Sequence, residues 1–238
     1  MRILVNVRMF VLLLCGLLLA LYFSWMANAA VGYGYSWLYQ WMDIDQHIEY
    51  FAPQNRFRQG FEKVSADGHV QAFNEIVRSV HSQGKGLADI EYLVEGKAIP
   101  LLHRAEIIHL QDVANLIDTI HYLAFFSALT FFITVFIGNR YFHQQGMRAD
   151  AKGVLVIFAV LMVSLASAVF IVGPKDVFYQ MHIWVFPDNH QWFFYYQDSL
   201  MSTMMKAPDL FAGIAAQIVL LALLFFAVGV SAARKFKL

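Results

Sequence analysis

VLVIFAVLMVSLASAVFIV, residues 154–172, decides the fold class, because this run contains no charged residue, no proline and no glycine. At 1.5 Å per residue such a helix is roughly 28 Å long, close to the ~30 Å hydrocarbon core of a bilayer. Residues 9–30, 117–137 and 211–233 form apolar stretches of comparable length. Soluble helices rarely stay so free of charge. We therefore expect an all-α integral membrane protein with four transmembrane helices.

The basic residues predict how these four helices are oriented. They gather before the first stretch, between the second and third, and after the fourth: Arg2 and Arg8; Arg140, Arg148 and Lys152; Arg234, Lys235 and Lys237. Four crossings put all three groups on one side, and the positive-inside rule makes that side cytoplasmic. Both termini are then cytoplasmic. The formal net charge is zero, so nothing favours binding to nucleic acid.

The remaining segments divide the chain into three parts. Residues 1–30 form the first transmembrane helix, and residues 31–116 a small, mainly helical extracytoplasmic cap. Residues 117–238 carry the other three helices, with a re-entrant or interfacial aromatic segment at 176–210. The first stretch also resembles a cleavable signal peptide ending at Ala27-Asn28-Ala29. It is longer than the usual apolar region of such peptides, which favours a retained helix.

Periodicity predicts a few elements within the cap. Apolar residues between Val70 and His81 recur at helical spacing, and Ile90–Val94 is typical of a short strand. From His103 to Leu116 the period is again helical, without proline or glycine, so one long helix is expected to run from the cap into the second span. Aromatic residues after the first span predict a belt at the outer interface, made of Tyr33, Tyr35, Trp37, Tyr39 and Trp41.

Two histidines, His109 and His182, are expected just outside the membrane on the extracytoplasmic side. A neutral histidine accepts a proton and returns it, which suits acyl transfer. Asp112, about one turn after His109, is a candidate to hold that ring in the correct tautomer. The competing interpretation is that each histidine is an interfacial polar side chain bonded to backbone or headgroups. Spacing alone does not separate the two.

Several other classes of site fit this sequence poorly. His103 and His109 are six residues apart, and His182 and His190 eight, so neither pair has the i, i+4 spacing of zinc ligands on a helix. We expect no metal and no cofactor. Cys15 is the single cysteine, which excludes an intrachain disulfide. The spans carry charges only near their ends, which argues against an ion or proton transporter.

A family resemblance rests on two motifs. The segment from Glu106 through His109 to Asp112-Val113 resembles the E-x-x-H-x-x-D-V signature of the bacterial lipoprotein intramolecular transacylases, Lit. The segment from Phe178 to His182, with the aromatic residues that follow, is similar to that family's region between spans three and four. Four spans, a small outer cap and the chain length also match. The resemblance therefore covers nearly the whole chain.

What the resemblance implies is a reaction within one substrate molecule. Family members act in the bacterial cell membrane on diacylated lipoproteins. They move an acyl chain from the glyceryl ester to the α-amine of the N-terminal cysteine, which gives the lyso-form lipoprotein. The two family histidines correspond to His109 and His182, which makes them the expected catalytic pair on the extracytoplasmic side.

Further residues are expected to contact the substrate or the surrounding lipid. Glu106, from the first motif, is a candidate for substrate binding. Aromatic side chains are expected to line the entrance for the acyl chain, namely Trp184, Phe186, Trp192 and Phe193. Ordinary interface anchoring explains these aromatic residues equally well. The alternative to an enzyme is a non-catalytic membrane protein that binds lipid or lipoproteins as a scaffold or assembly factor.

Overall fold

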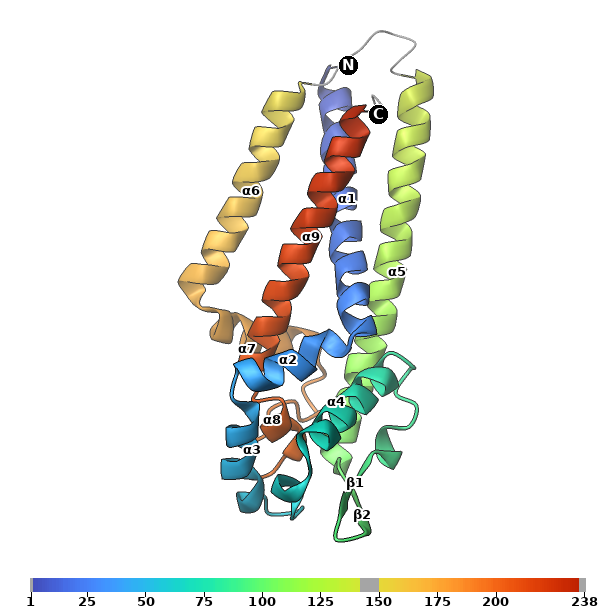
Figure 1. Cartoon of the computed structure of the whole chain (residues 1–238). Helices are drawn as coiled ribbons and strands as arrows, with labels where there is room; N and C mark the ends of the chain where they lie inside the picture. Colours follow the sequence, from blue (N-terminus) through green and yellow to red (C-terminus); the bar gives the residue numbers. More distant parts are fainter. Residues whose placement is uncertain (1, 142–149, 236–238) are drawn as a thin grey trace. The chain divides into compact units, whose positions relative to one another are not determined.

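The computed structural model describes residues 2–141 and 150–235. Its helices are α1 (Arg2–Ala30), α2 (Tyr35–Trp41), α3 (Ile44–Phe51), α4 (Ala66–Val80), α5 (Arg104–Tyr141), α6 (Ala151–Val172), α7 (Pro174–Val185), α8 (Leu200–Met204) and α9 (Asp209–Lys235) (Figure 1). Two strands, β1 (Glu91–Val94) and β2 (Lys97–Pro100), pair as an antiparallel hairpin. Four 3-10 turns lie between α1 and β1, at Gly32–Gly34, Ala52–Gln54, Phe61–Lys63 and Leu87–Asp89.

Helices α1, α5, α6 and α9 confirm the four predicted spans. The parts of them long and apolar enough to cross a membrane are Ile3–Ala30, Arg104–Gly138, Ala151–Val172 and Asp209–Ala233. Their outward-facing side chains are large and apolar; Phe132 is 68% exposed and Phe170 is 82% exposed. Apolar surface on this scale is unusual for a soluble monomer and suits contact with lipid. The protein is an all-α membrane protein.

The chain forms two compact units. The first comprises Met1–Ala27, Ile120–Pro174 and Gln217–Leu238. Its helices pack through a small apolar cluster in which Phe158 of α6 contacts Phe10 of α1 and Phe226 of α9, each with ring centroids 5.8 Å apart. Polar contacts add to it: the Ser24 hydroxyl donates to the carbonyl of Ile218 at 2.6 Å. In a bilayer, such packing and interhelical hydrogen bonds hold helices together.

The second unit comprises Asn28–Thr119 and Lys175–Ala216. The predicted cap and the aromatic segment that follows α6 therefore belong to one compact body. Tyr35 of α2 lies at the centre of this unit, where it stacks on Phe73 of α4 at 4.0 Å. Its hydroxyl donates to the carbonyl of Met204 at the end of α8, at 2.8 Å. The second unit thus has a core of its own, built from segments far apart in the sequence.

The structure has a helix and a strand at the places predicted within residues 31–116. The predicted helix at residues 70–81 is α4, which begins earlier because the Ser65 hydroxyl caps it by accepting from the Gly68 amide at 3.2 Å. The predicted strand is β1. The long helix expected from His103 into the second span is α5, with 38 residues. Gly173 ends α6 and Pro174 begins α7, as these two residue types favour.

The predicted aromatic belt is wrong for two of its members. Tyr35 and Tyr39 are buried, at 0% and 5% exposure, whereas Trp37 and Trp41 are 52% and 73% exposed. The reason is helical geometry: residues four apart on α2 share one face, and that face packs against α4. Tyr39 is fixed there by a 2.8 Å hydrogen bond to Nδ1 of His69.

Candidate active site

The two predicted histidines lie side by side in the second unit. His109 is on α5 and His182 is on α7, and their ring centroids are 6.0 Å apart with an angle of 33° between the planes. Each residue is only 8% exposed. Folding therefore brings together two imidazoles that are 73 positions apart in the sequence and largely removes both from water.

The backbone fixes the tautomer of His182. Its Nδ1 lies 2.7 Å from the carbonyl oxygen of Phe178, one turn earlier on α7. A carbonyl only accepts hydrogen bonds, so Nδ1 carries the proton, and the neutral ring keeps its lone pair on Nε2. Burial lowers the pKa of His182 from its ordinary value of 6.5, while the hydrogen bond to Phe178 opposes that shift. His182 is thus a neutral ring with Nε2 free to accept.

His109 has an unsatisfied polar atom. Its Nδ1 is buried and has no hydrogen-bond partner among the residues that the structure describes. An unpaired buried nitrogen costs about 1–3 kcal/mol, so proteins rarely leave one without a reason. A bound substrate or an ordered water molecule would satisfy it. Both histidines therefore have hydrogen-bonding capacity that the described side chains leave unused.

Aromatic rings surround the histidine pair. Phe186 lies 4.9 Å from the His109 ring and 5.1 Å from the His182 ring, and Trp192 lies 5.0 Å from His182. Phe194 contacts His109 at 6.0 Å. These rings exclude water and give the pair an apolar setting. Of the aromatic residues predicted from the sequence, Phe186 and Trp192 lie beside the pair. Trp184 is 79% exposed and Phe193 is 44% exposed, so they present apolar surface outward.

Glu106 occupies a different position from the one expected of a substrate ligand. Its carboxylate is buried at 1% exposure and accepts from the Ser199 hydroxyl at 2.5 Å and from the His103 amide at 2.6 Å. A longer contact at 3.4 Å reaches the amide of Met201. Ser199 caps α8 and His103 precedes α5, so one carboxylate joins the first turns of two helices. A carboxylate at helix N-termini is favourable. Glu106 thus holds α5 against the segment that carries Phe194.

Asp112 is paired with a histidine other than the expected one. Its Oδ2 accepts a hydrogen bond from Nδ1 of His190 at 2.6 Å. The His109 ring, which Asp112 was expected to hold, has the unpartnered Nδ1 described above. The expected orienting contact is therefore replaced by a link between α5 and the loop after α7. That link lies three residues beyond His109 and two residues before Trp192.

Four contributors to this site were missed from the sequence. The ring of Phe194 and the side chains of His190 and Ser199 act through contacts between distant segments, whereas the carbonyl of Phe178 acts within α7, one turn before His182. Only Ser199 had a local signal, since a serine before a short apolar run is a common helix cap. Within residues 2–141 and 150–235, no cluster of three or more His, Cys, Asp or Glu side chains has the geometry of a metal site.

Comparisons with known proteins agree with this architecture. Residues 6–207 match the family described as lipoprotein intramolecular transacylase Lit. No curated protein matches the chain. Among solved structures, the membrane integral lipoprotein intramolecular transacylase Lit from Bacillus cereus is similar, with a TM-score of 0.66 and 15% identity over 99% of this chain and 95% of that one.

A second structure of the Bacillus cereus protein, carrying a histidine-to-arginine mutation, gives a TM-score of 0.60 at 15% identity, over 96% of this chain and 91% of that one. At this identity the two structures show a shared fold. The match over residues 6–207 spans most of the sequence and is independent of that likeness. This chain therefore belongs to the lipoprotein intramolecular transacylase family, Lit.

Proposed function

We propose that this protein is a membrane acyltransferase that rearranges diacylated bacterial lipoproteins. It moves one acyl chain from the glyceryl ester to the α-amine of the N-terminal cysteine and leaves the lyso-form lipoprotein. The family assignment supports the reaction class. The observation that carries the proposal is the buried histidine pair, His109 and His182, with ring centroids 6.0 Å apart. At that separation both rings reach the atoms of a single ester.

The reaction needs one proton acceptor and one proton donor. The α-amine nitrogen attacks the ester carbonyl carbon and forms a C–N bond. The nitrogen gives up a proton, and the tetrahedral intermediate collapses as the C–O bond to the glyceryl oxygen breaks. That oxygen takes up a proton and leaves as an alcohol. No proton is gained or lost overall, so a pair of histidines can carry the whole exchange.

We assign the proton transfer to His182 and the stabilisation of the oxyanion to His109. The Phe178 carbonyl holds the proton of His182 on Nδ1, which leaves Nε2 as the acceptor. An α-amine has a pKa of about 7.7–8.0, so a substantial neutral fraction exists near pH 7. The protonated His182 then returns that proton to the leaving glyceryl oxygen, while an N–H of His109 donates a hydrogen bond to the oxyanion.

The surroundings of the pair favour transfer over hydrolysis. Phe186, Trp192 and Phe194 shield both rings, so few water molecules compete with the amine. Donor ester and acceptor amine belong to the same molecule, so the site mainly has to fold the substrate into an attacking geometry. Exposed apolar side chains on α7, such as Ile183 and Trp184, are suited to contact lipid or the acyl chains near the site.

We further propose that the site faces the extracytoplasmic side of the bacterial cell membrane. This rests on the basic residues at the other ends of the spans, among them Arg8, Arg140 and Lys152. Arg148 and Lys237 support the same orientation but lie outside the described residues.

Expression in a bacterial strain without N-acylation activity of its own tests the proposed function. Mass spectrometry of a lipoprotein's N-terminal peptide should show the N-acyl, monoacylglyceryl form with the wild-type protein. A scaffold would leave the peptide in its diacylglyceryl form and would co-purify with lipoprotein or lipid. A peptide that stays in its diacylglyceryl form would reject the enzymatic proposal, provided that the protein is present in the membrane at the level of an active relative.

A further inference from the structure

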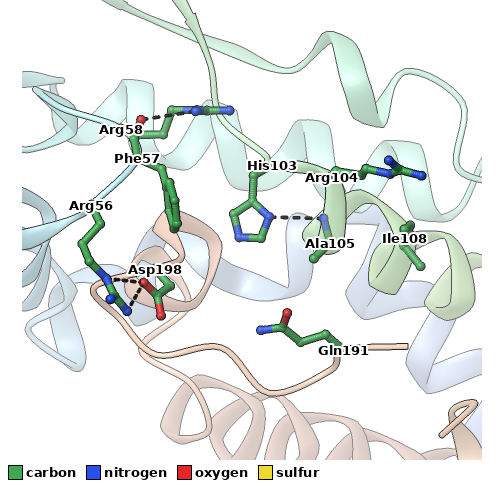
Figure 2. A pocket seen from close by; sticks show the side chains of 9 residues that line it. All are labelled: Arg56, Phe57, Arg58, His103, Arg104, Ala105, Ile108, Gln191 and Asp198. Carbon is green, nitrogen blue, oxygen red and sulfur yellow. Dashed lines mark hydrogen bonds and ion pairs between the residues drawn. The ribbon is translucent and has the colours of Figure 1, made fainter. Parts of the chain in front are cut away.

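A pocket of about 570 Å³ lies beside the histidine pair, on the side of the first turn of α5. Figure 2 shows that three segments far apart in the sequence form it: residues 56–58, the start of α5, and the loop that carries Gln191 and Asp198. Its volume is within the range of ligand sites, roughly 300–1,000 Å³. None of its lining residues belongs to the proposed catalytic pair.

The charges around this pocket are predominantly positive. Arg56 is paired with Asp198: the Nε of Arg56 donates to Oδ1 of Asp198 at 2.6 Å (Figure 2). Arg58 and Arg104 also line the pocket, and within the described residues neither forms an ion pair with a carboxylate. Two guanidinium charges are therefore left uncompensated. Guanidinium groups bind carboxylates through charge-assisted, often bidentate hydrogen bonds.

Arg58 is held ready for such a contact. Its Nε donates to the carbonyl of Pro100 at 2.7 Å, and its two terminal nitrogens donate to the carbonyls of Phe57 at 3.2 Å and Leu102 at 3.5 Å. Carbonyl partners restrict the side chain without neutralising its charge. The ordering cost of binding an anion is accordingly reduced.

The pocket lies close to the histidine pair, with the ring of Phe194 between them. His103 lines the pocket, and the ring of Phe194 lies 5.7 Å from His103 and 6.0 Å from His109. The rings of His103 and His109 are thus at most about 12 Å apart. An extended peptide covers roughly 3.3–3.6 Å per residue. A substrate cysteine at the histidine pair would place a side chain two to four residues further along the peptide in the pocket.

The position of the pocket along α5 argues against an anchored lipid headgroup. Arg104 precedes Ile117, where the apolar stretch begins, by thirteen residues, which is about 20 Å along the helix axis. Arg104 therefore lies five residues further from the apolar stretch than His109 does. The peptide of a lipoprotein, which leads away from the membrane, is better placed to reach it than a lipid headgroup.

We infer that this pocket binds an acidic side chain of the lipoprotein substrate, two to four residues after the acylated cysteine. The inference rests on the proposed function for the identity of the substrate. Binding there orients the peptide and supplies part of the energy that brings the amine and the ester to the histidine pair.

Synthetic diacylglyceryl lipopeptides test the inference with the purified full-length protein. They differ only at the third residue after the cysteine, which is Glu, Gln or Lys. For the wild type we expect roughly tenfold faster N-acylation of the Glu peptide than of the Gln peptide at low salt, the size expected for two exposed charge contacts. The Lys peptide should react most slowly, and 0.5 M salt should reduce the preference.

Two arginine variants and one control locate the effect. In Arg104→Gln and in Arg58→Gln the Glu-to-Gln ratio should fall towards one. Arg78→Gln, which removes an exposed arginine from α4 outside the pocket, should keep the wild-type ratio. A ratio of one in the wild type, or a full ratio in both pocket variants, would overturn the inference.

A binding measurement separates this inference from the proposed function. A fluorescent, acyl-free form of the Glu peptide should bind the wild type more tightly than its Gln counterpart, and the difference should vanish in Arg104→Gln. If binding depends on the arginine but neither lipopeptide is acylated, the proposed function fails and the anion site stands. If both are acylated equally and the Glu peptide has no binding advantage, the anion site alone fails. Preferential binding of glycerol phosphate, with no discrimination between the peptides, would indicate a headgroup site and overturn the inference.

Discussion

Asp112 and His190 form a hydrogen bond of 2.6 Å across 78 residues of sequence, and this bond fastens the loop after α7 to α5. Both side chains are partly buried, at 13% and 33% side-chain exposure. Asp112 lies three residues after His109 on α5, and His190 lies two residues before Trp192 in the loop. Asp112 therefore acts on the site by holding a loop in place, and it does so without touching His109 at Nδ1.

This pairing predicts a modest effect of Asp112→Asn. The variant should lower kcat less than His109→Ala does, because the His109 ring keeps its own packing against Phe186. The double variant Asp112→Asn/His190→Ala should be no less stable than the less stable of the two single variants. This corresponds to a coupling free energy of about 0.5–1 kcal/mol between the two side chains. Acylation rates and thermal unfolding of the four proteins measure this. If Asp112→Asn lowers kcat as much as His109→Ala does, Asp112 orients the His109 ring after all.

Removal of either histidine of the proposed catalytic pair should have a large effect. His109→Ala and His182→Ala should each reduce the rate of N-acylation by roughly 10²–10⁴-fold, the usual contribution of general acid–base catalysis. Mass spectrometry of the lipoprotein N-terminal peptide gives the yield. His81→Ala, in the second unit but outside the proposed site, is a matched control. Wild-type yield from either catalytic variant would contradict the assignment.

The pKa of His182 predicts how the stability of the second unit depends on pH. Burial lowers the folded-state pKa below 6.5, so the unfolded chain binds more protons at lower pH. Stability from this group is fully present above pH 6.5 and is lost as the pH falls towards the folded-state pKa. Thermal unfolding between pH 7.5 and 5 should show a declining melting temperature below about 6.5. His182→Phe should reduce the slope, and an unchanged slope would disprove the linkage.

Glu106→Ala should be strongly destabilising. The variant leaves the Ser199 hydroxyl and the His103 amide without their acceptor in a buried place and opens a cavity. The expected loss is about 3 kcal/mol or more of unfolding free energy. Glu106→Gln keeps the volume and one acceptor oxygen, so it should lose less. Denaturant or thermal melts of detergent-solubilised protein compare the two. Equal loss in both variants would show that the charge, rather than the shape and acceptor, is what matters.

Removal of one buried hydroxyl tests the core of the second unit. Tyr35→Phe keeps the stacking on Phe73 and deletes the donor to the Met204 carbonyl. The expected cost is about 1–2 kcal/mol of unfolding free energy, since the buried carbonyl loses its partner. Tyr50→Phe, at an exposed tyrosine of α3, should leave the melting temperature unchanged. A Tyr35→Phe melt identical to wild type would show that the hydroxyl contributes nothing.

The amino-acid sequence by itself determined the membrane class, the four spans and the continuous helix that leads from the cap into the second span, and it singled out His109 and His182 as candidates for one site. These depend on composition and on periodicity within one segment, which the hydrophobic effect and helix geometry translate directly into structure. The pattern of Val154–Val172 admits one physical outcome. For the same reason the resemblance to the Lit motifs was already visible in short stretches of residues.

Only the tertiary structure decided which side chains meet. Asp112 lies one helical turn from His109, and the sequence suggested a contact, yet folding brought His190 closer from a distant loop. Glu106 is a buried link between two helix ends because its partner Ser199 caps α8. Tyr35 is a core residue because its partner Phe73 lies on α4. The pocket beside His103 joins three separate segments. Such pairings depend on long-range packing, whose energy is shared among many contacts and leaves no periodic trace along the chain.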